Sequence, residues 1–339
     1  HVTWWTSTVD HQGKTLFKDI PGRENLSHNL DLYFLRGCFY KKNVSFSRLL
    51  NHYQIGRAFK KLCRNEDKPD LIVCSLPTLE LCYEAARYAS QHNIPFVIDV
   101  RDLWPDLFYE VFPKPLRFIA KYIFYPYEYF GRYALSQASS VCAISKDYLS
   151  WGLEKAGREG TNNDLVLPLG YPDLKNQPFT SQTRHQLERM GISFDRPIVW
   201  FVGSFVKSID LEPIIKVAGV MKTTHPDVQF VFSGQGEDEA HYKDLARNLS
   251  NIIWTGWLSQ DEIAFMGLKA LVGLAAYRAG ALQSLPNKFF EYMSFGLPIL
   301  SSLKGEAQQL LQEQKVGLTY QAGNAEDCLI RLQEILDNP

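Results

Sequence analysis

The sequence predicts an α/β fold made of two Rossmann-like, doubly wound domains that face a central cleft. Short apolar segments alternate with amphipathic segments along the whole chain, which is the pattern of βαβ units. Segments such as 198–202 and 228–232 are apolar on both faces, as in a parallel sheet that is covered by helices on each side. A polar stretch that contains prolines separates two such series, and ligands commonly bind between two domains of this kind.

The expected elements alternate in chain order. Strands are expected where apolar runs are bounded by turn residues, at 2–7, 71–75, 95–99, 140–144, 165–168, 198–203, 228–233, 252–255, 271–275, 298–302 and 317–320. Helices are expected where apolar residues recur three or four positions apart, at 46–64, 79–92, 115–136, 146–156, 181–190, 211–224, 238–249, 260–267, 287–295, 305–313 and 325–336.

The domain boundary is expected after Gly170, where the chain becomes polar and rich in Pro, Asn and Gln. We assign an N-terminal domain to 1–172, a linker to 173–196 and a C-terminal domain to 197–339. The chain begins inside a strand at His1 and stops directly after a helix. We therefore expect these residues to be the body of a longer protein.

Composition excludes several classes of function. The chain has 36 Lys and Arg residues against 37 Asp and Glu residues, so it is not a polybasic nucleic-acid binder. It has neither an apolar run of the roughly 18 residues that a membrane span needs nor an N-terminal signal pattern. The six cysteines are scattered without C-x-x-C spacing, which indicates reduced thiols in a cytoplasmic protein. The histidines do not form metal-binding pairs, so no metal is expected.

The helix expected at 287–295 carries the most informative motif. Ser284, Pro286 and Asn287 precede or open it, and Lys288 and Glu291 lie in its first turns. The free N–H groups and the dipole at a helix N-terminus suit a diphosphate. Glu291 would be close enough to accept hydrogen bonds from a ribose diol. The same residues also fit a plain capping role on a solvated face, and the local pattern leaves both interpretations open.

Residues 286–300, PNKFFEYMSFGLPIL, resemble the nucleotide-sugar motif of retaining GT-B glycosyltransferases of family four. Residues 98–105, IDVRDLWP, are similar to a segment of the branch that makes bacterial surface polysaccharides. Residues 201–211 occupy the place of the family's glycine loop, 232–236 that of a second glycine turn and 255–258 that of the base-side loop. The motifs occur in the family's order over both domains.

The resemblance implies a metal-independent transferase that uses a UDP-sugar with retention of configuration. Its donor-binding residues would be Gly203, Ser204, Lys207, Gly234, Trp257, Leu258, Gln283, Ser284, Leu285 and Glu291. In this scheme the glycine loops approach the phosphates, Trp257 and Leu258 flank the base, and Glu291 holds the ribose. Arg278 and Lys288 are the catalytic candidates on this side, because they would neutralise the leaving nucleotide diphosphate.

The chain also departs from the family pattern. Gln283 stands where the family has an acidic residue, so it offers the sugar an amide in place of a carboxylate. The family's glycine loop carries an Arg and a Lys, which are not both present here. Lys207 is off their usual spacing. The family's first strand with its glycine-rich loop would precede His1, and its closing helix would follow Pro339.

Asp102 is the catalytic candidate on the acceptor side. It follows the strand expected at 95–99, at the sheet edge where α/β active sites form. It could act as a base toward the acceptor hydroxyl or position that hydroxyl. The alternative is a structural ion pair between Arg101 and an aspartate, which would cap the loop that carries Trp104.

Residues 36–64 form a basic block, with eight Lys and Arg residues and no acidic residue. Basic residues beside the aromatic residues of helix 46–64 suit an anionic membrane surface or a lipid-diphosphate acceptor. Helix 115–136 carries a similar mixture, for which we favour a core-facing role of the aromatic residues. For residues 36–64 the absence of acids favours the membrane interpretation over a solvated face.

Together these observations indicate a glycosyltransferase that moves a sugar, of the N-acetylated hexose type, from a UDP-sugar to a lipid-linked or saccharide acceptor. The pathway would be cell-surface polysaccharide biosynthesis, and the location cytoplasmic or peripheral on the inner face of the membrane. Two alternatives stay open, a GT-B sugar-nucleotide epimerase and a non-enzymatic two-lobed nucleotide-sugar binding protein.

Overall fold

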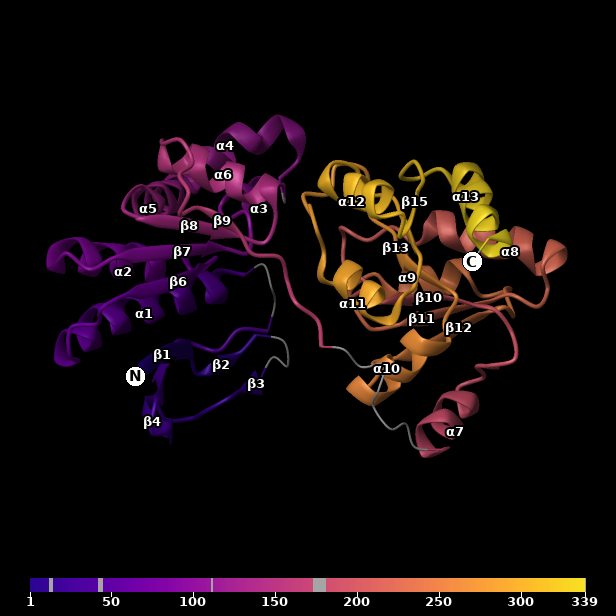
Figure 1. The fold of residues 1–339 in the computed structure, drawn as a ribbon, viewed down its shortest axis with the longest axis horizontal. Helices are drawn as coiled ribbons and strands as arrows, with labels where there is room; N and C mark the ends of the chain where they lie inside the picture. Colours follow the sequence, from indigo (N-terminus) through magenta and orange to yellow (C-terminus); the bar gives the residue numbers. More distant parts are fainter. Residues whose placement is uncertain (12–14, 42–44, 111, 173–180, 339) are drawn as a thin grey trace. The chain divides into compact units, whose positions relative to one another are not determined.

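The chain divides into two compact units, His1–Pro168 and Leu169–Pro339. The computed structural model describes the chain over residues 1–11, 15–41, 45–110, 112–172 and 181–338 (Figure 1). The sequence places the end of the first domain at 172, a few residues after this division. Of the predicted linker, 173–180 lies outside the described residues, and the remainder contains a helix that belongs to the second unit.

A three-stranded sheet begins the N-terminal unit. β1 (Val2–Ser7) pairs in parallel with β5 (Leu30–Leu35), which pairs antiparallel with β4 (Gly22–Ser27). The short strands β2 (Val9–Asp10) and β3 (Thr15–Leu16) pair with each other. The sequence predicts β1 but assigns no structure to 8–45, because β4 is polar and mostly exposed. The apolar run of β5 is the signal that could have identified this sheet.

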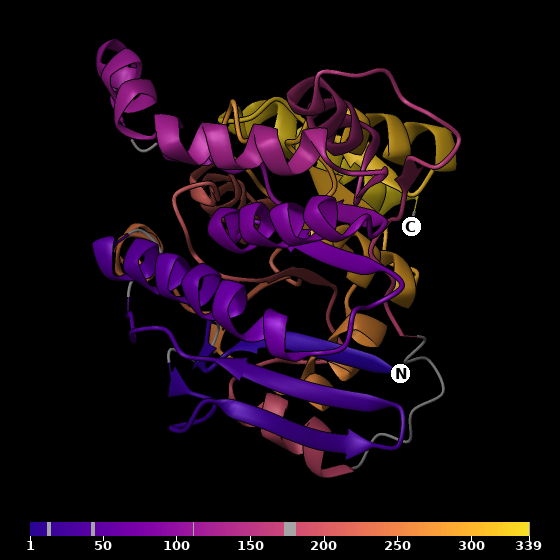
Figure 2. The ribbon, with the colours of Figure 1, turned by 90° about the vertical axis from the view of Figure 1, so that its left-hand side faces the viewer.

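The second sheet of this unit is parallel, and its strands follow chain order. It consists of β6 (Ile72–Leu76), β7 (Phe96–Val100), β8 (Ser140–Ala143) and β9 (Leu165–Val166). The strands are connected by α2 (Leu79–His92) after β6 and by α6 (Lys146–Ala156) after β8, while α1 (Phe46–Leu62) packs on α2 (Figure 2). A short 3-10 turn, Cys63–Asn65, ends α1.

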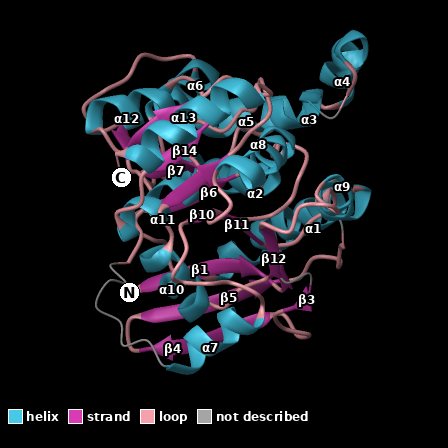
Figure 3. Cartoon of the chain, turned by 90° about the vertical axis from the view of Figure 1, so that its right-hand side faces the viewer, coloured by secondary structure: helices cyan, strands magenta, loops and turns pink. Residues whose placement is uncertain are grey.

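The predicted single helix at 115–136 is wrong, because the structure has two helices there. A short helix α3 (Asp106–Glu110) and a 3-10 turn (Lys114–Leu116) precede α4 (Arg117–Ile123) and α5 (Tyr125–Ser136). Pro126 lies in the first turn of α5, where its missing N–H is tolerated, but it cannot continue the hydrogen bonds of a preceding helix. α4 extends away from the strands of its own unit (Figures 2 and 3).

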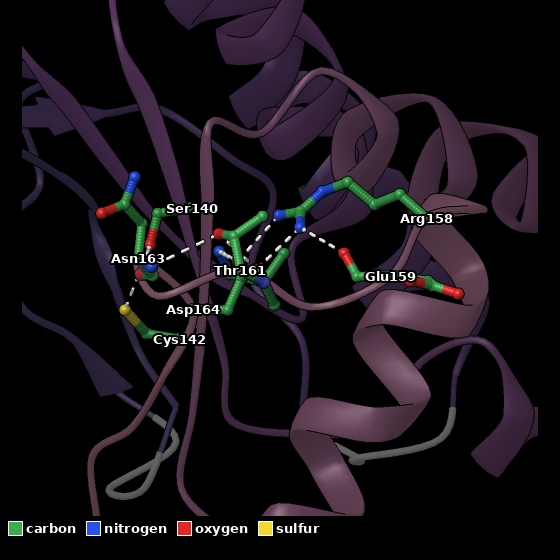
Figure 4. A network of polar contacts seen from close by, with 8 residues as sticks. Ser140, Cys142, Arg158, Glu159, Thr161, Asn163 and Asp164 are labelled. Carbon is green, nitrogen blue, oxygen red and sulfur yellow. Dashed lines mark hydrogen bonds and ion pairs between the residues drawn. The ribbon is translucent and has the colours of Figure 1, made fainter.

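A polar network holds the loop between α6 and β9 in place (Figure 4). The two terminal nitrogens of Arg158 each donate to a carboxylate oxygen of Asp164 at 2.7 Å. Asp164 also accepts from the backbone N–H groups of Val141 and Thr161, each at 2.7 Å. The Arg158 guanidinium holds the pKa of Asp164 well below its usual range. The network therefore ties the loop to β8 and places β9 at the sheet edge.

The C-terminal unit contains one six-stranded parallel sheet. Its strands are β10 (Ile198–Val202), β11 (Gln229–Ser233), β12 (Ile252–Gly256), β13 (Val272–Ala275), β14 (Ile299–Ser301) and β15 (Gly317–Thr319). They are ordered β12-β11-β10-β13-β14-β15, so the chain runs outward on one side of β10 and then on the other. This is the doubly wound order that the sequence predicts.

Helices cover both faces of this sheet. They are α7 (Ser181–Arg189), α8 (Glu212–Thr224), α9 (Glu239–Leu245), α10 (Gln260–Lys269), α11 (Asn287–Phe295), α12 (Glu306–Gln314) and α13 (Ala325–Asp337). α8 packs against α9 and α13, and α10 packs against α7 and α11, with the sheet between the two groups (Figure 1). Among the residues that the structure describes, every helix is too short or too polar to span a bilayer.

Candidate functional site

The candidate site lies at the point where the strand order of the C-terminal unit reverses. β10 and β13 are neighbours there. The strands that follow β10 lie on one side of this pair, and those that follow β13 lie on the other. Ligands of open α/β sheets bind at the carboxyl ends of strands beside such a reversal. The two loops that leave β10 and β13 are linked by an isolated bridge between Ile209 and Tyr277.

Tyr292 fixes α11 against this edge of the sheet. Its side chain is fully buried, and its hydroxyl accepts the N–H of Val202 at 3.1 Å and donates to the carbonyl of Leu274 at 3.0 Å. A Cβ at position 273 would lie 2.6 Å from the Tyr292 ring, so only glycine allows the helix to approach β13 this closely. The start of α11 is therefore held beside the ends of β10 and β13.

Lys288 lies one helical turn before Tyr292 and is buried, with 9% of its surface exposed. Its Nζ is 3.9 Å from the centre of the Phe201 ring and 3.1 Å from the place that a Cβ of Gly203 would take. Burial lowers the pKa of Lys288 to about 7, against the opposing effect of the nearby Glu291 charge. The structure thus places a cationic group directly beneath the glycine loop.

The predicted glycine positions are required by contacts within the protein. Gly203 has a φ of 144° and Gly234 a φ of 139°, which other residues rarely adopt. A Cβ at Gly234 would overlap the carbonyl of Gly203, and the Gly234 N–H donates to the Gly256 carbonyl at 2.7 Å. The loops that follow β10, β11 and β12 are therefore packed backbone against backbone.

The N-terminus of α11 is not capped by Ser284 or Asn287, so the structure does not support the capping alternative. Pro286 occupies the cap position and makes no side-chain cap hydrogen bond, and Asn287 is already helical. The Ser284 hydroxyl donates to Glu306 at 3.2 Å, and the neighbouring Leu285 is buried. The first amides of α11 therefore have no side-chain cap, as a site for an anion requires.

Gln283 carries a buried polar atom without a partner. Its Oε1 is inaccessible to solvent and has no hydrogen-bond partner among the described residues. Leaving such an acceptor unpaired costs about 1–3 kcal/mol. A ligand that donates a hydrogen bond at this position would remove that cost.

Glu291 is half-buried, and its carboxylate has a partner that the sequence analysis did not single out. The Tyr171 hydroxyl donates to Glu291 Oε1 at 2.6 Å. Burial raises the pKa of Glu291, whereas this hydrogen bond and the charge of Lys288 lower it. Tyr171 lies within the sequence Gly170-Tyr171-Pro172, which reads only as a turn, and its partner is 120 positions away.

The other predicted residues of this site lie on the surrounding loops. Arg278 donates through Nε to the Ile209 carbonyl at 3.2 Å and interacts with Tyr242. Trp257 is 68% exposed, whereas Leu258 is a core residue. The structure therefore leaves the Trp257 ring open to a planar ligand. The remaining two residues are on the exposed face of the glycine loop, Ser204 and Lys207.

The acceptor-side candidate Asp102 lies in the N-terminal unit. Arg101 forms an ion pair with Asp99 at 2.5 Å, and Asp102 takes no part in it. Asp102 faces the charge of Arg48, and burial raises its pKa. The ion pair that the sequence offers as an alternative exists, but it uses Asp99, whereas Asp102 accepts the backbone N–H of Leu103 at 3.2 Å.

α1 brings two further residues to this part of the N-terminal unit. The Arg48 guanidinium lies 4.5 Å from the centre of the Trp104 ring, and the His52 ring lies 5.3 Å from it. His52 is buried, and burial lowers its pKa to about 3, so it is neutral at physiological pH. In the sequence, Arg48 is one residue of the basic block and His52 has no indicated role, because only the fold brings α1 beside Trp104.

The basic block is smaller on the surface than the sequence suggests. Arg48 packs on Trp104, and Lys60 forms an ion pair with Glu84 at 3.1 Å. Lys42 lies outside the described residues. The exposed members are Arg36, Lys41, Arg57, Lys61 and Arg64.

Several apolar residues of α1 face the solvent. Phe46, Leu50 and Tyr53 are 90%, 49% and 51% exposed. They share one face of the helix with Arg57 and Lys61, because these positions recur three or four residues apart. This exposed face, from Phe46 to Lys61, is apolar in its first half and basic in its second.

Several aromatic residues at 115–136 are exposed, which corrects the core-facing interpretation for them, whereas Phe124 and Tyr127 pack against Phe108. On α4 and the start of α5, the exposed apolar side chains are Phe118, Ile119, Tyr122, Ile123, Tyr125 and Tyr129. Tyr122 has 81% of its surface exposed, beside the exposed Lys121. α4 and the start of α5 thus carry an unusual number of exposed apolar side chains.

Within the described ranges, no group of three or more His, Cys, Asp or Glu side chains is placed to hold a metal ion. The polar groups at the reversal point are instead a buried lysine, helix amides and a carboxylate. These groups suit a ligand that carries both phosphate and hydroxyl groups.

The C-terminal unit matches a known protein family. Residues 184–339 match the family model described as "Glycosyl transferases group 1". Sulfoquinovosyl transferase SQD2 of Arabidopsis thaliana is 24% identical over an alignment of 318 positions that covers 88% of this chain and 55% of that protein. The chain thus spans about half the length of this curated relative.

Solved structures resemble the whole chain. Sucrose-phosphate synthase from Thermosynechococcus elongatus aligns with a TM-score of 0.73 at 17% identity, covering 100% of this chain and 80% of that chain. Anabaena Alr3699/HepE, solved in complex with UDP, aligns with a TM-score of 0.62 at 14% identity, covering 91% and 77%. These likenesses show a GT-B fold, and the predicted fold class is confirmed.

Proposed function

We propose that this protein is a group 1 glycosyltransferase that transfers a sugar from a UDP-sugar with retention of configuration. The observation that carries the proposal is the start of α11, where Lys288, uncapped amides and Glu291 meet the glycine loops at the reversal of the strand order. The C-terminal unit matches the group 1 glycosyltransferase model, which supports a sugar nucleotide as the donor. The structural neighbour solved with UDP supports uracil as its base.

Each group would have a distinct task in the transfer. The bond between the anomeric carbon and the diphosphate oxygen breaks, and a bond to the acceptor oxygen forms on the same face of the sugar. The acceptor hydroxyl gives its proton to the leaving diphosphate or to Asp102. Negative charge develops on the leaving diphosphate, where Lys288 and the α11 amides stabilise it more strongly than in the ground state. Glu291 accepts hydrogen bonds from the ribose, and the unpaired Gln283 Oε1 accepts one from a sugar hydroxyl.

Incubation with a panel of UDP-sugars, with and without lipid-linked acceptors, tests this function. A glycosyltransferase releases UDP in step with a glycosylated acceptor. An epimerase would convert the sugar nucleotide without acceptor, and a binding protein would do neither. We expect acceptor-dependent release with an N-acetylated hexose donor; conversion without acceptor, or binding without turnover, would contradict the proposal.

Asp102 provides a test on the acceptor side. Because Asp102→Asn keeps the size of the side chain but removes its charge, we expect transfer to slow on the order of 10²-fold if the carboxylate takes or orients the acceptor proton. UDP affinity, measured by titration calorimetry, should change less than twofold, since Asp102 lies in the other unit. A parallel loss of UDP affinity and turnover, or a large drop in melting temperature, would instead indicate a structural role.

We further propose that the acceptor is lipid-linked, in cell-surface polysaccharide assembly, and that the protein works at the cytoplasmic surface of an anionic membrane. The exposed face of α1 supports this location, because it presents apolar residues beside basic ones. The exposed apolar side chains of α4 would add a second point of contact. Each basic residue near an anionic leaflet contributes about 1 kcal/mol.

Vesicle binding tests this surface. Changing Arg57, Lys61 and Arg64 together to Ser should remove about 3 kcal/mol of attraction, which is on the order of 100-fold in affinity for anionic vesicles. Lys60 is left in place because it pairs with Glu84. Cosedimentation with anionic and zwitterionic vesicles measures the effect, and high salt should release the wild type.

The matched control removes the same charge from the other unit, by changing the exposed Lys216, Lys222 and Lys269 to Ser. That variant should bind vesicles as the wild type does. Equal binding of the wild type to both vesicle types, or equal loss in both variants, would contradict a membrane role for the α1 face.

A further inference from the structure

Tyr171 contacts one face of α11 at two points. Its hydroxyl donates to Glu291 Oε1 at 2.6 Å, and its ring lies 6.2 Å from the Phe295 ring at an interplanar angle of 68°. Glu291 and Phe295 are four residues apart and therefore share one face of the helix. The ring contact fixes where Tyr171 sits, and the hydroxyl then meets the carboxylate.

This contact determines which carboxylate oxygen of Glu291 remains available to accept a hydrogen bond from a ligand. A carboxylate accepts hydrogen bonds at both of its oxygens. Tyr171 takes Oε1, and the short distance is that of a strong bond between a hydroxyl and an ionised carboxylate. The carboxylate is thereby held in one orientation, with Oε2 left for a further donor.

The contact also affects the charge of Glu291. Burial raises the pKa of this carboxyl, and the bond from Tyr171 is the larger of the two effects that lower it. Only the ionised carboxylate can accept two hydrogen bonds from a diol while it accepts a third from a tyrosine. Without the Tyr171 hydroxyl, Glu291 would be less well oriented and easier to protonate.

We propose that Tyr171 is a positioning residue of the nucleotide site, whose hydroxyl holds Glu291 Oε1 so that Oε2 receives the ribose hydroxyls of the donor. The inference rests on the proposed function, because it takes a ribonucleotide as the ligand. It adds a residue from the start of the C-terminal unit to a site that otherwise consists of α11 and the loops of the sheet.

Comparison of two ligands isolates this role. UDP has the ribose diol, whereas 2′,3′-dideoxy-UDP lacks it and keeps the base and the diphosphate. Tyr171→Phe retains the ring beside Phe295 and removes only the hydroxyl. We expect this variant to bind UDP three- to tenfold more weakly than the wild type, and to bind dideoxy-UDP equally well, by titration calorimetry.

Two further variants complete the test. Tyr88→Phe removes the same atom from a tyrosine of α2 in the N-terminal unit and should leave both affinities unchanged. In a Glu291→Gln background, Tyr171→Phe should cause no additional loss of UDP affinity, since the carboxylate that it orients is gone. The wild-type preference for UDP over dideoxy-UDP should fall as the pH is lowered, and should do so at a higher pH in Tyr171→Phe.

The outcomes separate this inference from the proposed function. A wild type that does not bind UDP overturns both. A wild type that binds UDP, with an unchanged preference for UDP over dideoxy-UDP in Tyr171→Phe, overturns the role of Tyr171 alone. Tighter binding of UDP by Tyr171→Phe also overturns it, because the hydroxyl would then compete with the ribose.

Discussion

Replacing Lys288 with Met is expected to slow sugar transfer by about 10²–10³-fold, the loss typical of removing one group that stabilises developing negative charge. Lys288 Nζ lies beneath Gly203 and against the Phe201 ring, where little water can screen it. Its charge would therefore act strongly on a diphosphate held by the glycine loop. Methionine fills a similar volume, and replacing a buried charge with an apolar side chain seldom destabilises a protein.

The pH dependence of UDP binding provides a second readout for Lys288. Its pKa of about 7 in the free protein means that the ammonium loses its proton as the pH rises from 7 to 9. A bound diphosphate favours the charged form, so binding must take up a proton in this range. The dissociation constant of UDP should then rise with pH in the wild type and stay flat in Lys288→Met.

The linked effect on stability has a definite sign. In the unfolded chain Lys288 titrates near its ordinary pKa of 10.5, so between pH 7 and 10 the unfolded state binds more protons than the folded state. The contribution of Lys288 to the free energy of unfolding therefore rises with pH over this range, and Lys288→Met should lose that rise. A UDP affinity that is independent of pH in the wild type would contradict a buried cation at the phosphate.

Replacing Glu291 with Ala is expected to weaken UDP binding tenfold or more. Charge-assisted hydrogen bonds contribute about 1.5–3 kcal/mol, and every 1.4 kcal/mol corresponds to a factor of ten. The fold should survive, because Tyr292 and the buried face of α11 hold the helix to the sheet independently of Glu291. Titration calorimetry with UDP measures the loss, and the melting temperature checks the fold.

Glu313→Ala is the matched control for this prediction. It removes the same side chain from an exposed position of α12 in the same unit, so UDP affinity should be unchanged. If Glu291→Ala binds UDP as tightly as the control does, Glu291 is only a residue of the helix surface.

The C-terminal unit shows how far local sequence signals extend. The bounds of α11 at 287–295 are confirmed, because Gly296 ends an amphipathic segment that Pro286 precedes. The six strands of its sheet are also confirmed, because short apolar runs between turn residues are buried in the sheet. Elements with weak or mixed signals were missed or wrong: the polar strand β4 was not assigned, and the helix at 115–136 is interrupted at Phe124.

Contacts over long distances in the chain could not be predicted in the same way. Tyr171 and Glu291 are 120 positions apart, and no local pattern links a tyrosine in a turn to an acid on a helix. Arg48 is one of several basic residues in the sequence, yet only the packing of α1 beside Trp104 removes it from the exposed surface. For the same reason, the sequence does not indicate that Lys60 pairs with Glu84 or that Gly234 packs against the Gly203 carbonyl.

The sequence by itself determined the alternation of strands and helices and the two-domain α/β class, because periodicity and turn residues are properties of neighbouring residues. The GT-B class followed from the resemblance of the motif on α11 to a known family. The tertiary structure alone decided the surroundings of each charge. It buried Lys288 beneath Gly203, gave Glu291 a tyrosine partner, and exposed Phe46 and Tyr53 on one face of α1. Burial and partners set the pKa and the free hydrogen-bonding capacity of a side chain, and both depend on segments that meet only after the chain has folded.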